Sequence, residues 1–233
     1  MAMIKTTDEI AALRRAAKAG TAVFEQTLPL IRAGTTERFL AARMEVFAEA
    51  LEGYGTYGGL SFLPIIASGP NGAEPHAELS DRAFEPGDFI TIDFGVVIDG
   101  YCSDMTRTFL LGEPTEKQRE VYDSVLRAQE AGLAAAKAGI KCRDLDRVCR
   151  SLIEKDGYGD YFIHTTGHGI GTEVHEDPRI GKEGETMLEA DMVITIEPGI
   201  YLKDWGGVRI EDTVILTEDG CEVITAGIPK SLL

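Results

Sequence analysis

The sequence has no run of apolar residues that is long enough to cross a membrane. Although 44% of its 233 residues are hydrophobic, no stretch approaches the roughly 18 uninterrupted apolar residues that a spanning helix requires. The N-terminus also lacks the apolar core of a secretory signal peptide. We therefore expect a globular protein in the cytoplasm, with no membrane partner.

Cysteines and basic residues are also few. The four cysteines form no CxxC pair and no regular framework, which favours free thiols in a reducing compartment without assigned chemistry. The 23 basic residues are outnumbered by 39 acidic ones, so the formal net charge is -16. This charge has the wrong sign for holding a phosphate backbone, so we expect no nucleic-acid partner. Bound divalent cations would offset part of the negative charge.

The chain repeats one helical pattern. Apolar residues at helical spacing predict a helix over Thr7 to Ile31, with Thr7-Asp8-Glu9 as its cap, and a second helix from about Thr35 to Leu51. In the second half, Thr115-x-x-Gln118 is a capping box that opens a helix to about Lys137, and another helix follows.

Three pairs of landmarks recur at nearly one interval. They are Gly34 and Gly139 (139 minus 34 is 105), Gly53 and Gly157 (157 minus 53 is 104), and Asp93 and Glu197 (197 minus 93 is 104). The interval predicts two similar halves, about 1–112 and 113–233, which meet at the turn Gly112-Glu113-Pro114. Because no flexible linker divides them, we expect a single domain over 1–233.

Runs of β-favouring residues follow the helices in each half, and we expect them to form hairpins. Helices followed by strands indicate an α+β fold, and a duplicated unit with a pseudo-two-fold axis would bring equivalent residues to one centre. The runs are Phe89 to Ile98, Cys102 to Leu111, Met192 to Tyr201 and Val208 to Leu216.

Four acidic residues lie in or beside these apolar strands. Asp93 ends one apolar run and Glu197 ends its counterpart, while Asp104 and Glu211 are expected within the strands that follow. Each one alone is more often a turn or surface residue. At equivalent positions in a duplicated frame, however, buried acids favour a metal site, because a buried carboxylate needs a partner.

Histidines supply a nitrogen ligand and candidate proton donors. Two divalent cations that share bridging carboxylates would neutralise four clustered acids, and His168, between glycines, would complete the ligand set. Three of the four histidines, His164, His168 and His175, lie within 12 residues. The fourth, His76, lies upstream in a loop, where a solvated residue is the ordinary alternative.

The ordered set Asp93, Asp104, His168, Glu197 and Glu211 resembles the metal signature of the pita-bread metallopeptidases, which include methionine aminopeptidases, aminopeptidase P and prolidase. The resemblance covers nearly the whole chain. Three local motifs resemble the Xaa-Pro-cleaving branch: the runs Gly167 to Glu176, Glu197 to Tyr201 and Gly207 to Asp212.

The resemblance implies a role for each matching residue. Asp93 would chelate one metal, Asp104 and Glu211 would bridge both, and His168 and Glu197 would bind the other. His76, His164, His175 and Arg209 match positions that line the substrate site, and the catalytic residues would be Glu197 as a proton acceptor with His76 and His175 as donors. The cofactor would be two divalent ions, manganese first, with cobalt, zinc and iron as alternatives.

The sequence therefore predicts a metal-dependent peptidase that cleaves the N-terminal bond of a peptide substrate, with Xaa-Pro as the expected sequence. The alternatives are a methionine aminopeptidase, a non-catalytic peptide-binding or protein-binding module of the same fold, and creatinase-like hydrolysis without metal. Proline-specific relatives usually carry an additional N-terminal domain, whereas this chain starts directly before the first helix. Peptide length and assembly, including a homodimer, are therefore left open.

Overall fold

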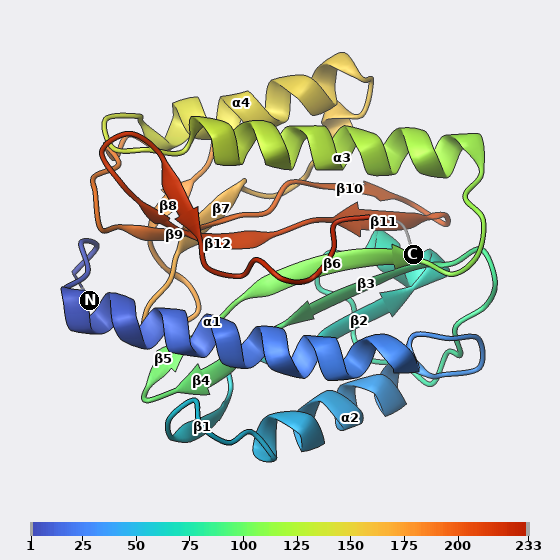
Figure 1. Ribbon diagram of the computed structural model, residues 1–233. Coiled ribbons are helices and arrows are strands. Elements are labelled where there is room, and N and C mark those ends of the chain that lie inside the picture. The colour runs from blue at the N-terminus through green and yellow to red at the C-terminus, as the bar shows by residue number, and fades with distance from the viewer. Residues whose placement is uncertain (1, 232–233) are drawn as a thin grey trace.

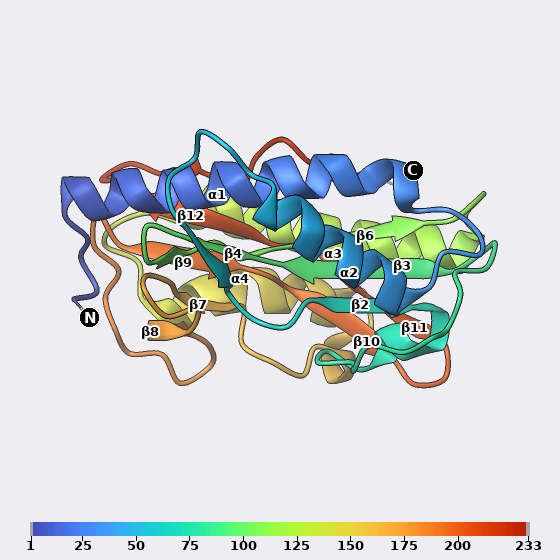
Figure 2. The same cartoon turned by 90° about the horizontal axis from the view of Figure 1, so that it is seen from below.

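The fold was obtained as a computed structural model that describes residues 2–231. Figure 1 shows the strands between two layers of helices. Helices α1 (Thr7–Thr27) and α2 (Glu37–Glu49) form one layer, and α3 (Glu116–Ala135) and α4 (Cys142–Lys155) form the other. The view from below in Figure 2 shows α2 crossing beside α1, with α3 and α4 behind the strands. The predicted α+β class is confirmed.

The helix starts follow the capping chemistry of the sequence. The predicted capping box at Thr115 and Gln118 is present, with both reciprocal hydrogen bonds formed. The start of α1 differs from the prediction by one residue, because the cap is Thr6. Its hydroxyl accepts from the backbone N–H of Glu9, and the Glu9 carboxylate accepts from the Thr6 N–H at 2.8 Å. The helix also ends earlier than predicted, at Thr27.

Thirteen strands in the described part of the chain form four antiparallel sheets. The sheet orders are β1-β4-β5, β2-β3-β6, β10-β11 and β13-β12-β9-β7-β8. The first half contributes β1 (Tyr57–Leu60), β2 (Ile65–Ser68), β3 (Phe89–Phe94), β4 (Val96–Ile98), β5 (Tyr101–Cys102) and β6 (Met105–Leu110). The second half contributes β7 (Gly167–Gly169), β8 (Glu176–Ile180), β9 (Val193–Ile196), β10 (Gly199–Leu202), β11 (Gly206–Arg209), β12 (Asp212–Leu216) and β13 (Cys221–Val223).

Each of the four predicted strand runs is interrupted, which corrects the simple hairpin expectation. β3 pairs with β6, whereas β4 leaves that sheet to pair with β1 and β5. Asp104 therefore lies between β5 and β6, and Glu211 lies between β11 and β12, not within a strand as the sequence suggested. Glu197 likewise follows β9 directly. Asp104, Glu197 and Glu211 therefore lie between strands, where the chain passes from one pairing partner to another.

Gly95 lies at the break after β3, where the chain passes very close to Ser103. A Cβ atom at this position would overlap the backbone carbonyl oxygen of Ser103. The hydroxyl of Ser103 accepts from the backbone N–H of Val96 at 2.9 Å. The chain segments before and after the break can therefore approach closely only because residue 95 is glycine, and this contact holds Asp104 beside the end of β3.

Backbone hydrogen bonds repeat between the halves at the predicted interval. Gly34 N–H donates to Phe84 O at 3.0 Å, and Gly139 N–H donates to Leu188 O at 2.8 Å. The arithmetic is 139 minus 34, or 105, and 188 minus 84, or 104. These pairs support the duplication, and the superposition of the two whole halves stays a prediction, as does the single domain.

The buried apolar side chains form two large clusters, one under each pair of helices, and a smaller third cluster joins residues of both halves, such as Leu13 and Val193. One core cluster lies under α1 and α2 and includes Phe24, Leu40 and Phe109. A second lies under α3 and α4 and includes Val125 and Ile196. Among residues 2–231, no helix is both long and apolar enough to cross a membrane.

Candidate metal centre

A cleft of about 1860 Å³ opens at the strand breaks. All of the residues that the sequence predicts as ligands or substrate contacts line it. The structure therefore brings together side chains from both halves. They are His76, Asp93, Asp104, His164, His168, His175, Glu197, Arg209 and Glu211.

Three of the predicted ligands form a compact group. One ligand atom from each of Asp104, His168 and Glu211 lies within 4.8 Å of the other two, and all three residues are buried. The Nε2 atom of His168 lies 3.6 Å from Asp104 Oδ2 and 3.2 Å from Glu197 Oε1. The other ring nitrogen, Nδ1, lies 3.0 Å from the carbonyl oxygen of Gly169. Donation from Nδ1 to this oxygen makes Nε2 the ring nitrogen that can bind a cation once it has lost its proton.

Asp93 enters the same site from β3. Arg209 donates from Nη2 to Asp93 Oδ2 at 2.8 Å. Two carboxylate oxygens, Asp93 Oδ1 and Glu211 Oε1, are buried without a hydrogen-bond partner among the residues that the structure describes. Buried carboxylate oxygens require a donor or a cation. Oxygen-rich donors with one imidazole fit a divalent transition metal.

The electrostatics of the acids also fit a cation. Burial, followed by the charge of Glu211, raises the pKa of Asp104 well above its usual range. Burial, followed by the charge of Glu197, does the same for the pKa of Glu211. The pKa of Asp93 is raised by burial although Arg209 opposes the shift. These carboxylates resist being charged together, which a divalent ion between them would relieve.

Glu197 differs from the other acids because His168 stabilises its charge. Burial works in the opposite direction, but the hydrogen bond from His168 and its positive charge lower the pKa of Glu197 to about 2. The same contact raises the pKa of His168 against the effect of burial. The hydroxyl of Thr195 also donates to Glu197 Oε1 at 3.0 Å. Glu197 is thus held as a carboxylate with its oxygen facing His168.

The three other histidines occupy different environments. His175 is exposed in the cleft with its ring centroid 4.4 Å from that of His168, and burial and the charge of His168 lower its pKa. His76 is exposed in the loop between η2 (Gly69–Ala73) and β3. His164 is half-buried, with Nδ1 2.7 Å from Thr165 O and Nε2 2.9 Å from the Tyr201 hydroxyl. Its ring nitrogens are thus occupied by protein atoms.

Three polar residues in the site were not singled out from the sequence. The hydroxyl of Thr106 donates to Glu211 Oε2 at 2.6 Å, and Thr195 bonds Glu197 as described. Tyr201 accepts a hydrogen bond from Arg209 Nη1 at 2.7 Å. A spacing of two residues, which puts side chains on one face of a strand, could have indicated Thr195 before Glu197. No comparable signal pointed to the Tyr201 hydroxyl.

Comparison with known proteins agrees with this geometry. Residues 11–218 match metallopeptidase family M24. The chain belongs to this family. It is 45% identical over 223 residues to the Xaa-Pro dipeptidase of Pyrococcus furiosus, an alignment that covers 96% of this chain and 63% of that protein. The chain thus spans somewhat less than two thirds of the length of this M24 relative.

Solved structures of other M24 proteins share the fold. An Xaa-Pro dipeptidase from Bacillus anthracis matches with a TM-score of 0.95 and 46% identity, over 99% of this chain and 64% of that one. An X-Pro aminopeptidase from Thermotoga maritima matches with a TM-score of 0.93 and 43% identity, over 99% and 64% of the two chains. The pita-bread fold that the sequence predicted is therefore confirmed, and membership of a metallopeptidase family implies divalent metal ions.

Proposed function

We propose that this protein removes the N-terminal residue of peptides whose second residue is proline, in a metal-dependent reaction. The observation that carries the proposal is the convergence of five potential ligands on one cleft, where two buried carboxylate oxygens have no hydrogen-bond partner among residues 2–231. The names of the relatives, Xaa-Pro dipeptidase and X-Pro aminopeptidase, support proline at the second position.

We assign the metal site to two divalent ions, with manganese as the first candidate. Asp93 would hold one ion, His168 and Glu197 the other, and Asp104 and Glu211 both. Oxygen-rich ligation with one imidazole suits manganese, although cobalt, zinc and iron bind similar donors. When bound, such ions lower the pKa of water and polarise an amide carbonyl.

The side chains around the ligands have separate tasks in this proposal. Glu197 would take the proton of the attacking water. In the metal-free site its contact with His168 lowers its pKa to about 2, which makes it a weak base there, and binding of His168 to a metal would remove that contact. His175 has a lowered pKa, so its neutral ring has one N–H to donate to the developing oxyanion. His76 is the second candidate donor from the opposite half of the chain.

Arg209 and His164 organise the site in this scheme. Arg209 ties Asp93 to the Tyr201 hydroxyl, and His164 meets that hydroxyl from the other side. Since both ring nitrogens of His164 have protein partners, we assign it to shaping the cleft wall that the substrate contacts. The cationic N-terminal amine of a peptide would be favoured by the surrounding carboxylates.

A substrate panel tests the proposed function. The protein is stripped of metal with a chelator, supplied with manganese, and offered Xaa-Pro dipeptides, longer Xaa-Pro peptides, and peptides that begin with Met-Ala. We expect hydrolysis of the Xaa-Pro peptides only, and only with metal. Cleavage restricted to Met-Ala peptides would indicate a methionine aminopeptidase, and peptide binding without cleavage would indicate a binding module. Metal-independent cleavage would contradict the metal assignment.

The expected partner is the peptide substrate. A homodimer, the cytoplasmic location and the absence of nucleic-acid binding stay predictions from the sequence. Sedimentation of the purified protein measures directly whether it forms a homodimer. The comparison of dipeptides with longer peptides in the panel also decides between dipeptidase and aminopeptidase activity.

A further inference from the structure

Glu37 is an acidic residue outside the metal centre that is completely buried. It is the first residue of α2, where an acid is favoured by the helix dipole and normally remains in water. Here its exposed fraction is 0%. Burial of a carboxylate is costly unless its oxygens are fully hydrogen-bonded, so its surroundings must compensate.

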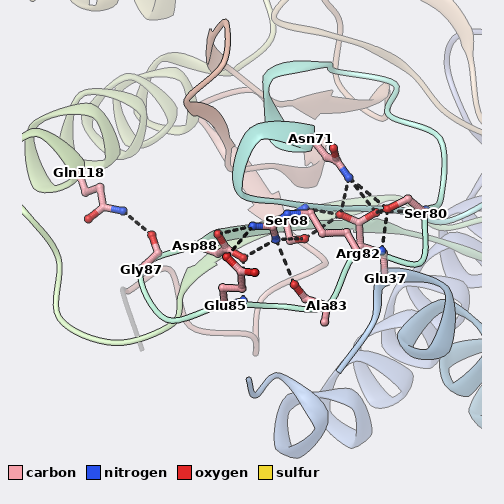
Figure 3. Close-up of polar contacts among 10 residues, drawn as sticks. All are labelled: Glu37, Ser68, Asn71, Ser80, Arg82, Ala83, Glu85, Gly87, Asp88 and Gln118. Carbon is pink, nitrogen blue, oxygen red and sulfur yellow. Dashed lines mark hydrogen bonds and ion pairs between the residues drawn. The ribbon is translucent and has the colours of Figure 1, made fainter. Parts of the chain in front are cut away.

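Donors from two segments surround the Glu37 carboxylate. Oε1 accepts from the backbone N–H of Ser68 at 2.8 Å, from the Ser68 hydroxyl at 2.7 Å and from Asn71 Nδ2 at 3.0 Å. Oε2 accepts from the backbone N–H of Ser80 at 3.1 Å and from its hydroxyl at 2.7 Å. Figure 3 shows Asn71 above this carboxylate and Ser80 beside it, both directed toward its oxygens. Both oxygens are therefore well supplied with donors.

The donors Asn71 and Ser80 enclose the loop that carries His76. They also bond each other, from Asn71 Nδ2 to Ser80 Oγ at 3.2 Å. Residues 71–80 thus form a short loop whose ends meet at Glu37, and its tip lines the metal cleft. On the cleft side, Arg209 donates from Nη1 to Pro75 O at 3.3 Å. The loop is therefore fixed from two sides, by Glu37 behind it and Arg209 in front.

The second half of the chain builds the equivalent backbone contact without a carboxylate. Glu37 N–H donates to Arg82 O, and its counterpart Cys142 donates to Thr186 O; 142 minus 37 is 105, and 186 minus 82 is 104. The position that corresponds to Ser80 is Gly184, where a Cβ would lie 2.6 Å from Cys142 Cβ. Apolar packing suffices there. The repeated backbone contact therefore does not require an acid at this position.

We propose that Glu37 is a positioning residue for the reaction, which holds the loop 71–80 so that His76 faces the metal cleft. The inference rests on the proposed function for the role of His76. Glu37 does not touch the substrate. It fixes both ends of the loop, and the loop sets where the His76 imidazole can donate a hydrogen bond, so a small displacement reduces turnover.

A double-mutant cycle on the full protein tests this role. Glu37→Gln keeps the shape of the side chain but replaces one acceptor with a donor, which leaves loop donors without a partner. We expect the variant to lower kcat about tenfold when His76 is present, and less than about twofold in a His76→Ala background, because interacting residues are not additive. The manganese content should stay unchanged. An equal loss in both backgrounds would overturn the positioning role.

Asp88→Asn is the matched control. Asp88 is also buried and pairs with Arg82 at 2.5 Å, but it bonds neither Asn71 nor Ser80. It is connected to the Glu37 cluster indirectly, because Arg82 Nη1 donates to Ser68 Oγ at 2.8 Å and the Arg82 N–H donates to Ser80 Oγ at 3.0 Å. Asp88→Asn should lower stability but leave every direct bond to Glu37 in place. Its effect on kcat should therefore differ by less than about twofold between the wild-type and His76→Ala backgrounds. If Glu37→Gln does not fold, Asn71→Ala and Ser80→Ala remove the loop donors instead, and they should show the same coupling to His76.

Amide hydrogen exchange gives a readout that needs no activity. Exchange in the loop 71–80 should rise about tenfold or more in Glu37→Gln and should rise much less in Asp88→Asn, within about twofold of wild type. Unchanged exchange in Glu37→Gln would contradict the anchoring itself. The two proposals can fail separately. If the wild-type protein cleaves no Xaa-Pro peptide, the proposed function is wrong. If exchange in the loop still rises in Glu37→Gln, the anchoring of the loop by Glu37 is nevertheless supported.

Discussion

Arg209 donates to Asp93 at 2.8 Å and so links the two halves of the chain inside the candidate metal centre. Arg209 ends β11 of the second half, and Asp93 lies in β3 of the first. Both side chains are buried. Burial alone would lower the pKa of Arg209, but Tyr201, Asp93 and Glu197 raise it well above its usual range. The guanidinium therefore stays charged and holds one oxygen of Asp93, while the other oxygen, Oδ1, has no hydrogen-bond partner in the described part of the chain.

Replacement of this arginine tests that link. Arg209→Ala should reduce kcat/KM by about a hundredfold, because Asp93 and Tyr201 lose their common partner. Loss of one member of a buried ion pair also costs about 3–5 kcal/mol in the metal-free protein. Metal content should stay at the wild-type level, since Arg209 is not a ligand. Elemental analysis beside steady-state kinetics checks both points, and a variant that loses its metal would contradict this separation of roles.

His175 is predicted to act on the substrate and not on the metal. His175→Ala should lower turnover by roughly a hundredfold or more, as expected for a lost transition-state donor, with unchanged metal content. The surface residue Arg14, which pairs with Glu222 far along the chain, provides a control: Arg14→Ala should leave turnover within about twofold of wild type. Full activity of His175→Ala, or loss of metal from it, would show that the role is wrong.

The raised pKa of Asp104 predicts how the metal-free protein responds to pH. An acid whose pKa is higher in the folded state destabilises the fold as pH rises from its unfolded value, about 3.9, through the folded value. In the presence of chelator at about pH 7, Asp104→Asn should therefore be more stable than wild type, by on the order of 1 kcal/mol. The difference should shrink as the pH approaches about 4.

Urea unfolding across this pH range measures the effect. With saturating manganese the order should reverse, since metal binding stabilises the wild-type fold and the variant lacks a ligand. Destabilisation by Asp104→Asn in chelator at neutral pH would contradict the electrostatic account.

The sequence predicted the duplicated pattern and the convergence of the acids because these depend on order and interval. The number of residues between equivalent acids such as Asp93 and Glu197 can be counted in the sequence, whichever strands pair with each other. The strand pairing was harder to predict, since a glycine within an apolar run, such as Gly95, indicates a bend without showing which strand pairs next. The change of pairing partner at Gly95 depends on the close approach of Ser103, which is a tertiary contact. Asp104 and Glu211 were therefore placed in strands instead of between them.

Other parts of the site left little trace in the sequence. An acidic residue such as Glu37 is ordinary at the start of a helix. The residues next to it in the sequence do not indicate that Asn71 and Ser80 bond its carboxylate. The hydroxyl of Tyr201 likewise acquires its role only when β10 and β11 bring it to Arg209. Contacts such as these join residues that are far apart in the sequence. They depend on the strand topology, which local residue patterns do not predict.

The central claim is that five side chains of this chain hold two divalent ions, and anomalous X-ray diffraction from manganese-loaded crystals tests it most directly. We expect two anomalous peaks in the cleft, with oxygen or nitrogen atoms of the five residues about 2.0 to 2.3 Å from an ion. Asp104 and Glu211 should contact both ions. The predicted ligands are Asp93, Asp104, His168, Glu197 and Glu211. Peaks that lie away from the cleft, or ions that bind without Asp104 and Glu211, would contradict the account.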